Sequence, residues 1–162
     1  MRRIGILTGG GDCPGLNAVI RGVVESCAAA EMEVFGFFAG WRGVIEDDGK
    51  MLRLEDVEGL QTKGGTILGS SRTNVMKIPD GPMLVKDALE HHGLEGLVVT
   101  GVAQRGNIGL GETLIAATQM IGERNVFDLA APMPGDDRAR DVVERLAAAG
   151  ADSEDAGLVG MI

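Results

Sequence analysis

A glycine-rich turn directly follows a short apolar run, and this junction limits the possible folds more than any other feature of the chain. Residues 3–8 (RIGILT) are short and apolar, as expected of a buried parallel strand. The turn, residues 8–17 (TGGGDCPGLN), leads into a segment over about 14–30 with apolar residues at helical spacing. The junction therefore predicts a strand, a tight turn and a helix, which is the first βα unit of a parallel sheet.

The same alternation continues along the chain. In chain order we expect a strand over 33–38, a polar irregular stretch over 40–50, a short helix over 52–60, a glycine-led turn over 64–69, a helix over 80–92 and a strand over 97–100. In the 80–92 helix, the residues expected to face inward are Leu84, Val85, Ala88 and Leu89. Cys27 falls on the apolar face of the first helix, so we expect it to be buried and reduced.

The last third of the chain keeps the αβ rhythm, with a helix expected over 112–121, a strand over 125–129 and a helix over 136–149. No internal repeat and no low-complexity linker divides the chain. We therefore predict a single domain over residues 1–162. Its fold class is α/β, a three-layer, doubly wound (Rossmann-like) and mostly parallel sheet, with right-handed crossovers.

Charge and composition exclude some classes of partner. The 162 residues carry a formal net charge of −9, which argues against a nucleic-acid-binding face, since that requires clustered Lys and Arg. No run of about 18 apolar residues predicts a membrane span, and the N-terminus lacks the apolar region of a signal peptide. With only two cysteines there is no disulfide framework. We expect a soluble, cytoplasmic protein.

The glycine turn has two interpretations that its spacing alone leaves open. Glycines let the backbone approach an anion closely, and a helix N-terminus presents free N–H groups, so the turn is suited to a small phosphate. The alternative is a turn that only packs the strand against the helix. The spacing is neither that of a dinucleotide-binding fingerprint nor that of a Walker A loop.

Four motifs carry a resemblance to a known family. They are residues 10–17 (GGDCPGLN), 20–24 (IRGVV), 40–43 (GWRG) and 64–74 (GGTILGSSRTN). In this order and spacing, over about residues 3–101, the chain resembles the N-terminal domain of the 6-phosphofructokinases. The ending Ser-Ser-Arg-Thr-Asn of the last motif is similar to that of members that use pyrophosphate.

The resemblance implies phosphoryl transfer from ATP or pyrophosphate to fructose 6-phosphate, with Mg²⁺ as cofactor. It implies that ATP, ADP or pyrophosphate is bound by Gly9, Gly10, Gly11, Asp12, Arg72 and Thr73. A guanidinium suits this role because it stays charged and binds phosphate in a bidentate fork. Arg21 matches a position associated in some members with effector binding between subunits of a homo-oligomer; the simpler alternative is a solvated helix arginine.

The match fails beyond residue 101. Where the family has a Gly-Gly-Asp element whose aspartate handles magnesium, this chain has residues 101–105 (GVAQR), which contain no carboxylate. The family's catalytic aspartates have only a weak counterpart in Asp136 and Asp137, which are more simply explained as helix caps. Residues 102–162 thus form a divergent part that completes the sheet.

Two functional hypotheses follow. The first is a phosphofructokinase-derived domain that binds phosphates or nucleotides but is catalytically incomplete. The second is a non-catalytic structural α/β domain from a truncated or engineered sequence. His91 and His92 stand at the end of a predicted helix, where we expect them to interact with the helix dipole rather than to act as catalytic bases.

Overall fold

The computed structural model describes residues 2–11, 14–102 and 125–130. The helices predicted over 112–121 and 136–149 lie outside these residues, as do Asp12, Asp136 and Asp137. The strand predicted over 125–129 is confirmed, because Asn125–Ala130 forms the last strand described.

The described residues form one five-stranded sheet, in the order β3-β2-β1-β4-β5. Its strands are β1 (Arg3–Gly10), β2 (Glu33–Phe37), β3 (Gly49–Leu52), β4 (Gly96–Val102) and β5 (Asn125–Ala130). The pairs β1–β2, β1–β4 and β4–β5 are parallel, and only β3 runs antiparallel to its neighbour β2. The prediction of a mostly parallel sheet is confirmed.

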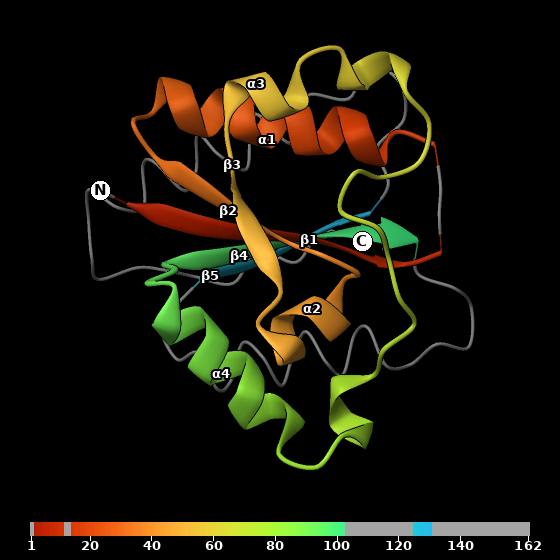
Figure 1. The fold of residues 1–162 in the computed structure, drawn as a ribbon, viewed down its shortest axis with the longest axis vertical. Helices are drawn as coiled ribbons and strands as arrows, with labels where there is room; N and C mark the ends of the chain where they lie inside the picture. Colours follow the sequence, from red (N-terminus) through yellow and green to blue (C-terminus); the bar gives the residue numbers. More distant parts are fainter. Residues whose placement is uncertain (1, 12–13, 103–124, 131–162) are drawn as a thin grey trace.

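Helices cover both faces of the sheet and complete three layers (Figure 1). The helices are α1 (Leu16–Ala29), α2 (Trp41–Glu46), α3 (Leu54–Val57) and α4 (Gly81–His91), with short 3₁₀ turns η1 (Leu60–Thr62) and η2 (Val75–Lys77). In Figure 1, α1 and α3 lie above the sheet and α2 and α4 below it. This arrangement confirms the doubly wound α/β fold. None of the described helices is long and apolar enough to cross a membrane.

Each face of the sheet has its own apolar cluster because side chains alternate along a strand. Ile4 and Ile6 of β1 pack with the buried face of α1, whereas Leu7 packs with residues of α2 and α4. Cys27 is fully buried in the α1 cluster, and burial raises the pKa of its thiol to about 12. The prediction that Cys27 is buried and reduced is confirmed, because it is a free thiol.

Two expectations from the sequence are wrong. The stretch 40–50 is not irregular, since it contains α2 and the start of β3. The helix is too short for its periodicity to be recognised, and β3 is defined by pairing with β2 rather than by an apolar run of its own. Leu84 does not face inward but is 37% exposed, whereas Val85, Ala88 and Leu89 are buried as predicted.

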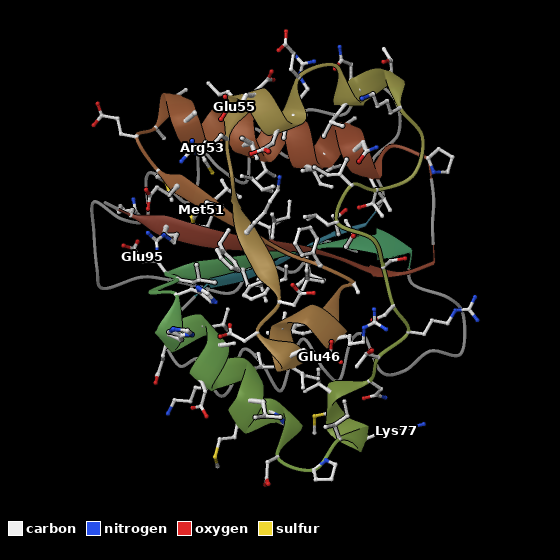
Figure 2. All side chains as sticks on the ribbon, in the orientation of Figure 1. Glu46, Met51, Arg53, Glu55, Lys77 and Glu95 are labelled. Atoms are coloured by element: carbon white, nitrogen blue, oxygen red, sulfur yellow. The ribbon has the colours of Figure 1, made fainter. Side chains whose placement is uncertain are left out.

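Charged side chains mark the outer surface. Figure 2 labels Arg53, which directly precedes α3, and Glu55, which lies in its first turn; their side chains are 76% and 75% exposed, respectively. Asp56, in the same helix, pairs with Lys50 of β3, with 2.7 Å between Nζ and Oδ1. These contacts fasten the short α3 to the edge of the sheet.

Candidate phosphate-binding site

The predicted glycine turn lies at the carboxyl ends of the two central strands. From β1 the chain proceeds to β2 on one side, while β4 pairs with β1 on the other. The order of strands therefore reverses beside β1, and in open α/β sheets ligands bind outside the carboxyl ends of strands at such a switch point. The pairs Gly9–Gly101 and Gly10–Val102 stand opposite each other at this edge.

Glycine is required at this edge for two physical reasons. Gly10 has φ +82°, a left-handed conformation that side chains with a Cβ adopt only with strain. Across the sheet, a Cβ on Gly101 would lie 1.8 Å from the carbonyl oxygen of Gly9. At Gly9, Gly10 and Gly101 the two strand ends thus present backbone atoms and no side chain.

The segment 63–74 is docked onto this edge by hydrogen bonds from two directions. The Gly10 N–H donates to the Ser71 carbonyl at 3.2 Å, and the Thr8 hydroxyl donates to the Gly69 carbonyl at 2.5 Å. The Thr8 and Thr66 hydroxyls are also 3.0 Å apart. The two glycine motifs, 10–17 and 64–74, are therefore joined in space although residues 18–63 lie between them in sequence.

Asn17, in the first turn of α1, ties the same segment down from the other side. Its side-chain amide donates to the carbonyls of Lys63 (3.1 Å) and Gly64 (3.3 Å), and its Oδ1 accepts from the Ile67 N–H at 2.8 Å. Asn17 is only 3% exposed, so these bonds are made away from water. The asparagine of the first motif therefore positions the second motif.

The structure brings most of the predicted donor-site residues together. Arg72 directly follows Ser71, whose carbonyl accepts from Gly10, and its side chain is exposed. The Thr73 hydroxyl lies 2.9 Å from that of Ser71. In this structure the Gly10 N–H is bonded to the protein's own backbone. The other predicted site residues among those described are Gly9, Gly11, Arg72 and Thr73.

A polar group that sequence reasoning missed lies at the same edge. Thr100 is fully buried, and within the described part of the chain its hydroxyl has no hydrogen-bond partner. Thr100 pairs with Thr8 in the sheet, so both side chains project from the same face of adjacent strands. The only sequence signal was a Thr-Gly pair near the carboxyl end of each strand. A buried hydroxyl without a partner is costly.

The described residues do not fit the magnesium ion that the resemblance implies. At this edge, residues 8–11 and 100–102 include no carboxylate, which is the ligand that Mg²⁺ requires beside donor phosphates. Arg21 lies elsewhere, on α1. Its Nε donates to Glu25 Oε1 at 2.7 Å, and its guanidinium also contacts Gln61.

Comparison with known proteins agrees with the geometry. The sequence model for "Phosphofructokinase" matches residues 3–108, which is beyond the predicted limit of the resemblance. A pyrophosphate–fructose 6-phosphate 1-phosphotransferase of Amycolatopsis methanolica is 50% identical over 100 residues, covering 61% of this chain and 29% of the relative. An ATP-dependent 6-phosphofructokinase 3 of Streptomyces coelicolor is 39% identical over 131 residues, covering 80% of this chain and 36% of the relative.

A solved structure shares the fold. Phosphofructokinase of Pichia pastoris in the T-state superimposes with a TM-score of 0.70 at 26% identity, covering 81% of this chain and 15% of that one. Fold and strand ends together define a doubly wound α/β protein with glycines at the carboxyl ends of β1 and β4. The chain belongs to the phosphofructokinase family. It spans about a third of the length of the curated relatives that it matches.

Proposed function

We propose that the described residues form the phosphoryl-donor side of a phosphofructokinase site, binding the phosphates of ATP, ADP or pyrophosphate. The supporting observation is the hydrogen bond from the Gly10 N–H to the Ser71 carbonyl, 3.2 Å long, which places Arg72 beside the glycine turn. An exposed guanidinium next to a backbone surface without bulky side chains is a suitable partner for a diphosphate group. Gly9, Gly11, Asp12 and Thr73 belong to the same proposed site.

Pyrophosphate is the donor that we favour. The ending of the second motif, residues 70–74, is similar to that of pyrophosphate-using members, and the relative from Amycolatopsis methanolica carries pyrophosphate in its name. The acceptor implied by the resemblance is fructose 6-phosphate. The described edge offers no separate set of basic side chains for a sugar phosphate, so we assign only the donor side to this part of the chain.

We further propose that the chain as given is catalytically incomplete. In this chain Val102 and Ala103 follow Gly101 where the family has a magnesium-binding aspartate. Without a carboxylate there, a divalent ion bridging the donor phosphates lacks its protein ligand, and the developing charge of phosphoryl transfer is poorly stabilised. A catalytic role for Asp136 or Asp137, an effector role for Arg21, a cytoplasmic location and a homo-oligomer all stay predictions.

Calorimetric titration with pyrophosphate, ATP and ADP, each with and without Mg²⁺, tests the donor site. We expect saturable binding that Arg72→Ala weakens by about tenfold, because the variant loses a charge-assisted, bidentate contact. Lys86→Ala is the matched control: it also removes one exposed positive charge, from the middle of α4. Equal binding by both variants, or no binding by the unmodified chain, would reject the donor site in favour of a purely structural domain.

The double substitution Val102→Gly/Ala103→Asp tests the proposed incompleteness. If the missing carboxylate is the defect, this variant gains a magnesium-dependent increase in donor affinity that the unmodified chain lacks. If magnesium already strengthens binding to the unmodified chain to the same extent, the metal ligand lies elsewhere and the proposed incompleteness is wrong.

A further inference from the structure

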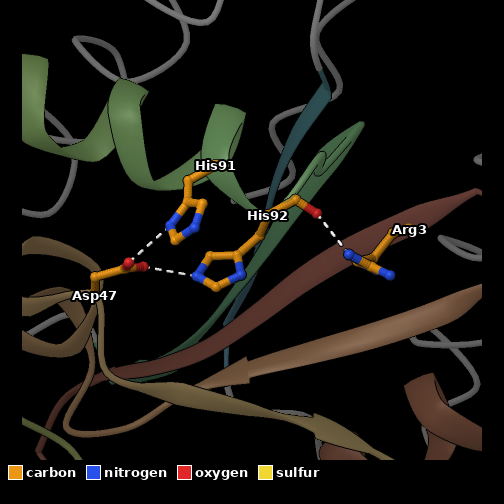
Figure 3. Close-up of polar contacts among 4 residues, drawn as sticks. All are labelled: Arg3, Asp47, His91 and His92. Atoms are coloured by element: carbon orange, nitrogen blue, oxygen red, sulfur yellow. Dashed lines mark hydrogen bonds and ion pairs between the residues drawn. The ribbon is translucent and has the colours of Figure 1, made fainter.

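We call the carboxyl ends of β1 and β4, with the proposed donor site, the phosphate edge. A second cluster of polar side chains lies away from it, at the point where α2 and α4 both end (Figure 3). Asp47 follows the last residue of α2, His91 ends α4, and His92 is the next residue. Both imidazoles point at one carboxylate: His91 Nδ1 is 2.8 Å from Asp47 Oδ2, and His92 Nε2 is 2.6 Å from Asp47 Oδ1. Consecutive helical residues do not normally face the same partner, so this convergence depends on the helix ending here.

We propose that Asp47, His91 and His92 form a binding site for a divalent transition-metal ion, with Zn²⁺ as its occupant. One ligand atom from each residue lies within 4.8 Å of the other two, and this is the one such group that the described ranges contain. Two imidazoles and one carboxylate are the donors that Zn²⁺ prefers, whereas Mg²⁺ favours oxygen ligands alone. The site is therefore distinct in chemistry from the magnesium site that the family resemblance implies.

One of the three ligands, His92, is held in place by its surroundings. The His92 ring stacks on Phe35 with centroids 4.0 Å apart and meets Phe37 edge-on at 5.9 Å. Its carbonyl accepts a hydrogen bond from Arg3 Nη1 at 2.9 Å, and its side chain is 19% exposed. Little ordering entropy is lost when this side chain binds an ion. Asp47 lies in the turn that leads to β3, with a left-handed backbone, φ +56° and ψ +39°.

The other two ligands have the freedom to complete the coordination. Zinc–ligand bonds are about 2.0–2.2 Å long, so the ligand atoms of a tetrahedral site are about 3.3 Å apart. The cluster holds its ligand atoms 2.8 Å and 2.6 Å apart, so the His91 and Asp47 side chains, 69% and 40% exposed, have to shift slightly outward to admit an ion. The open side leaves the fourth position to water, as in zinc sites with three protein ligands.

The electrostatic environment favours a cation. Both imidazoles contact the Asp47 carboxylate, so the cluster places anionic oxygen at the position that the ion would take. The cluster also lies at the C-terminus of α4, where the helix dipole is negative. When the ion binds, it takes the place of the proton that lies between each imidazole and the carboxylate. Each imidazole is then neutral and carries its remaining proton on the other ring nitrogen.

Titration of the full chain with Zn²⁺ by calorimetry, with Co²⁺ absorption as a second readout, tests the site. We expect one bound ion per chain, and a melting temperature that rises by several degrees when zinc is in excess. His91→Ala and Asp47→Asn should each weaken binding by about tenfold or more. Asparagine tolerates the left-handed backbone at position 47, so this variant should keep its fold, which far-ultraviolet circular dichroism verifies.

Two controls keep the outcome specific. Asp87→Asn removes an exposed carboxylate of α4 outside the cluster and should leave zinc affinity unchanged. Cys13→Ser removes the thiol most able to compete for zinc, since Cys27 is buried. The site is rejected if the unmodified chain shows no saturable binding, if neither cluster variant weakens it, or if the Co²⁺ spectrum shows a thiolate charge-transfer band that Cys13→Ser abolishes.

Discussion

Two regions of the molecule are held together by different forces. We call the first the seam, formed by residues 8–11, Asn17 and 63–74, and the second the β3 edge, formed by residues 47–56. In the seam, neutral hydrogen bonds join groups that are almost completely buried: Thr8 is 0% and Asn17 3% exposed. At the β3 edge, the Lys50–Asp56 pair joins side chains that are 46% and 25% exposed.

The difference determines how each region responds to damage. A buried hydrogen bond that loses one partner leaves the other unsatisfied away from water, which costs about 1–3 kcal/mol. An exposed ion pair exchanges its partner for water, so its net contribution is typically about 0–1 kcal/mol. The phosphate edge therefore rests on the more rigid of the two regions, whereas the β3 edge is the more tolerant.

The substitution Gly101→Ala should have the largest effect. Its Cβ would lie 1.8 Å from the Gly9 carbonyl oxygen, so the β1 and β4 backbones have to separate beneath the seam. We expect a loss of about 3 kcal/mol or more in the free energy of unfolding, measured with urea. Gly64→Ala is the control, because nothing lies within 4 Å of its Cβ, and it should change stability by less than about 0.5 kcal/mol.

Asn17→Ala breaks the seam from the side of α1. It removes three hydrogen bonds at once, to Lys63, Gly64 and Ile67, and leaves those backbone groups without their partner. We expect a loss of about 2–3 kcal/mol in urea unfolding. Asn74→Ala removes only the cap of η2 and should cost about 1 kcal/mol. Equal losses would contradict the central role given to Asn17.

A matched pair of threonines sharpens the comparison within the seam. Thr8→Val leaves the Gly69 carbonyl without its donor and should cost about 1–2 kcal/mol. Thr100→Val removes a buried hydroxyl that has no partner among the described residues, so stability should stay the same or rise. Thermal unfolding of the two variants in parallel measures the difference, and a larger loss for Thr100→Val would show that its hydroxyl is bonded.

The smallest effect is expected at the β3 edge, and it depends on pH. The hydrogen bond from Lys50, together with that from the Arg53 N–H, lowers the pKa of Asp56 from its ordinary 3.8. A lowered folded-state pKa stabilises the fold above the unfolded value and loses that contribution as pH falls through the folded value. Asp56→Asn should therefore cost about 0.5 kcal/mol or less at neutral pH, and the difference should vanish in strong acid. A difference that grew on acidification would contradict the pairing.

Most of the central fold could be predicted because its signals are local. The apolar runs of β1 and β4 and the periodic faces of α1 and α4 each lie within one stretch of sequence. The prediction of an irregular stretch over 40–50 was wrong because β3 becomes a strand only through pairing with β2. The prediction that Leu84 faces inward was wrong because the apolar face of α4 is narrower than helical spacing alone implies.

The proposed donor site and the Asp47 cluster also differed in how far local sequence signals could identify them. The glycine turn and Arg72 were identified through motifs that the family resemblance supplied, but that Asn17 and the Gly10–Ser71 hydrogen bond join them was visible only in the fold. The Asp47 cluster was missed, since its members are 44 and 45 residues apart in sequence and no local pattern connects them. The adjacent histidines at a helix end were the one available signal, and they were attributed to the helix dipole alone.

The antiparallel strand β3 has a consequence for how the molecule behaves in a crowded solution. Among the described strands it ends the sheet on its side, where unpaired backbone groups invite a strand from a second molecule. It is only four residues long, and the charged pair that Lys50 makes with Asp56 would have to lose water before another chain could align there. The short, charged strand β3 thereby discourages edge-to-edge aggregation.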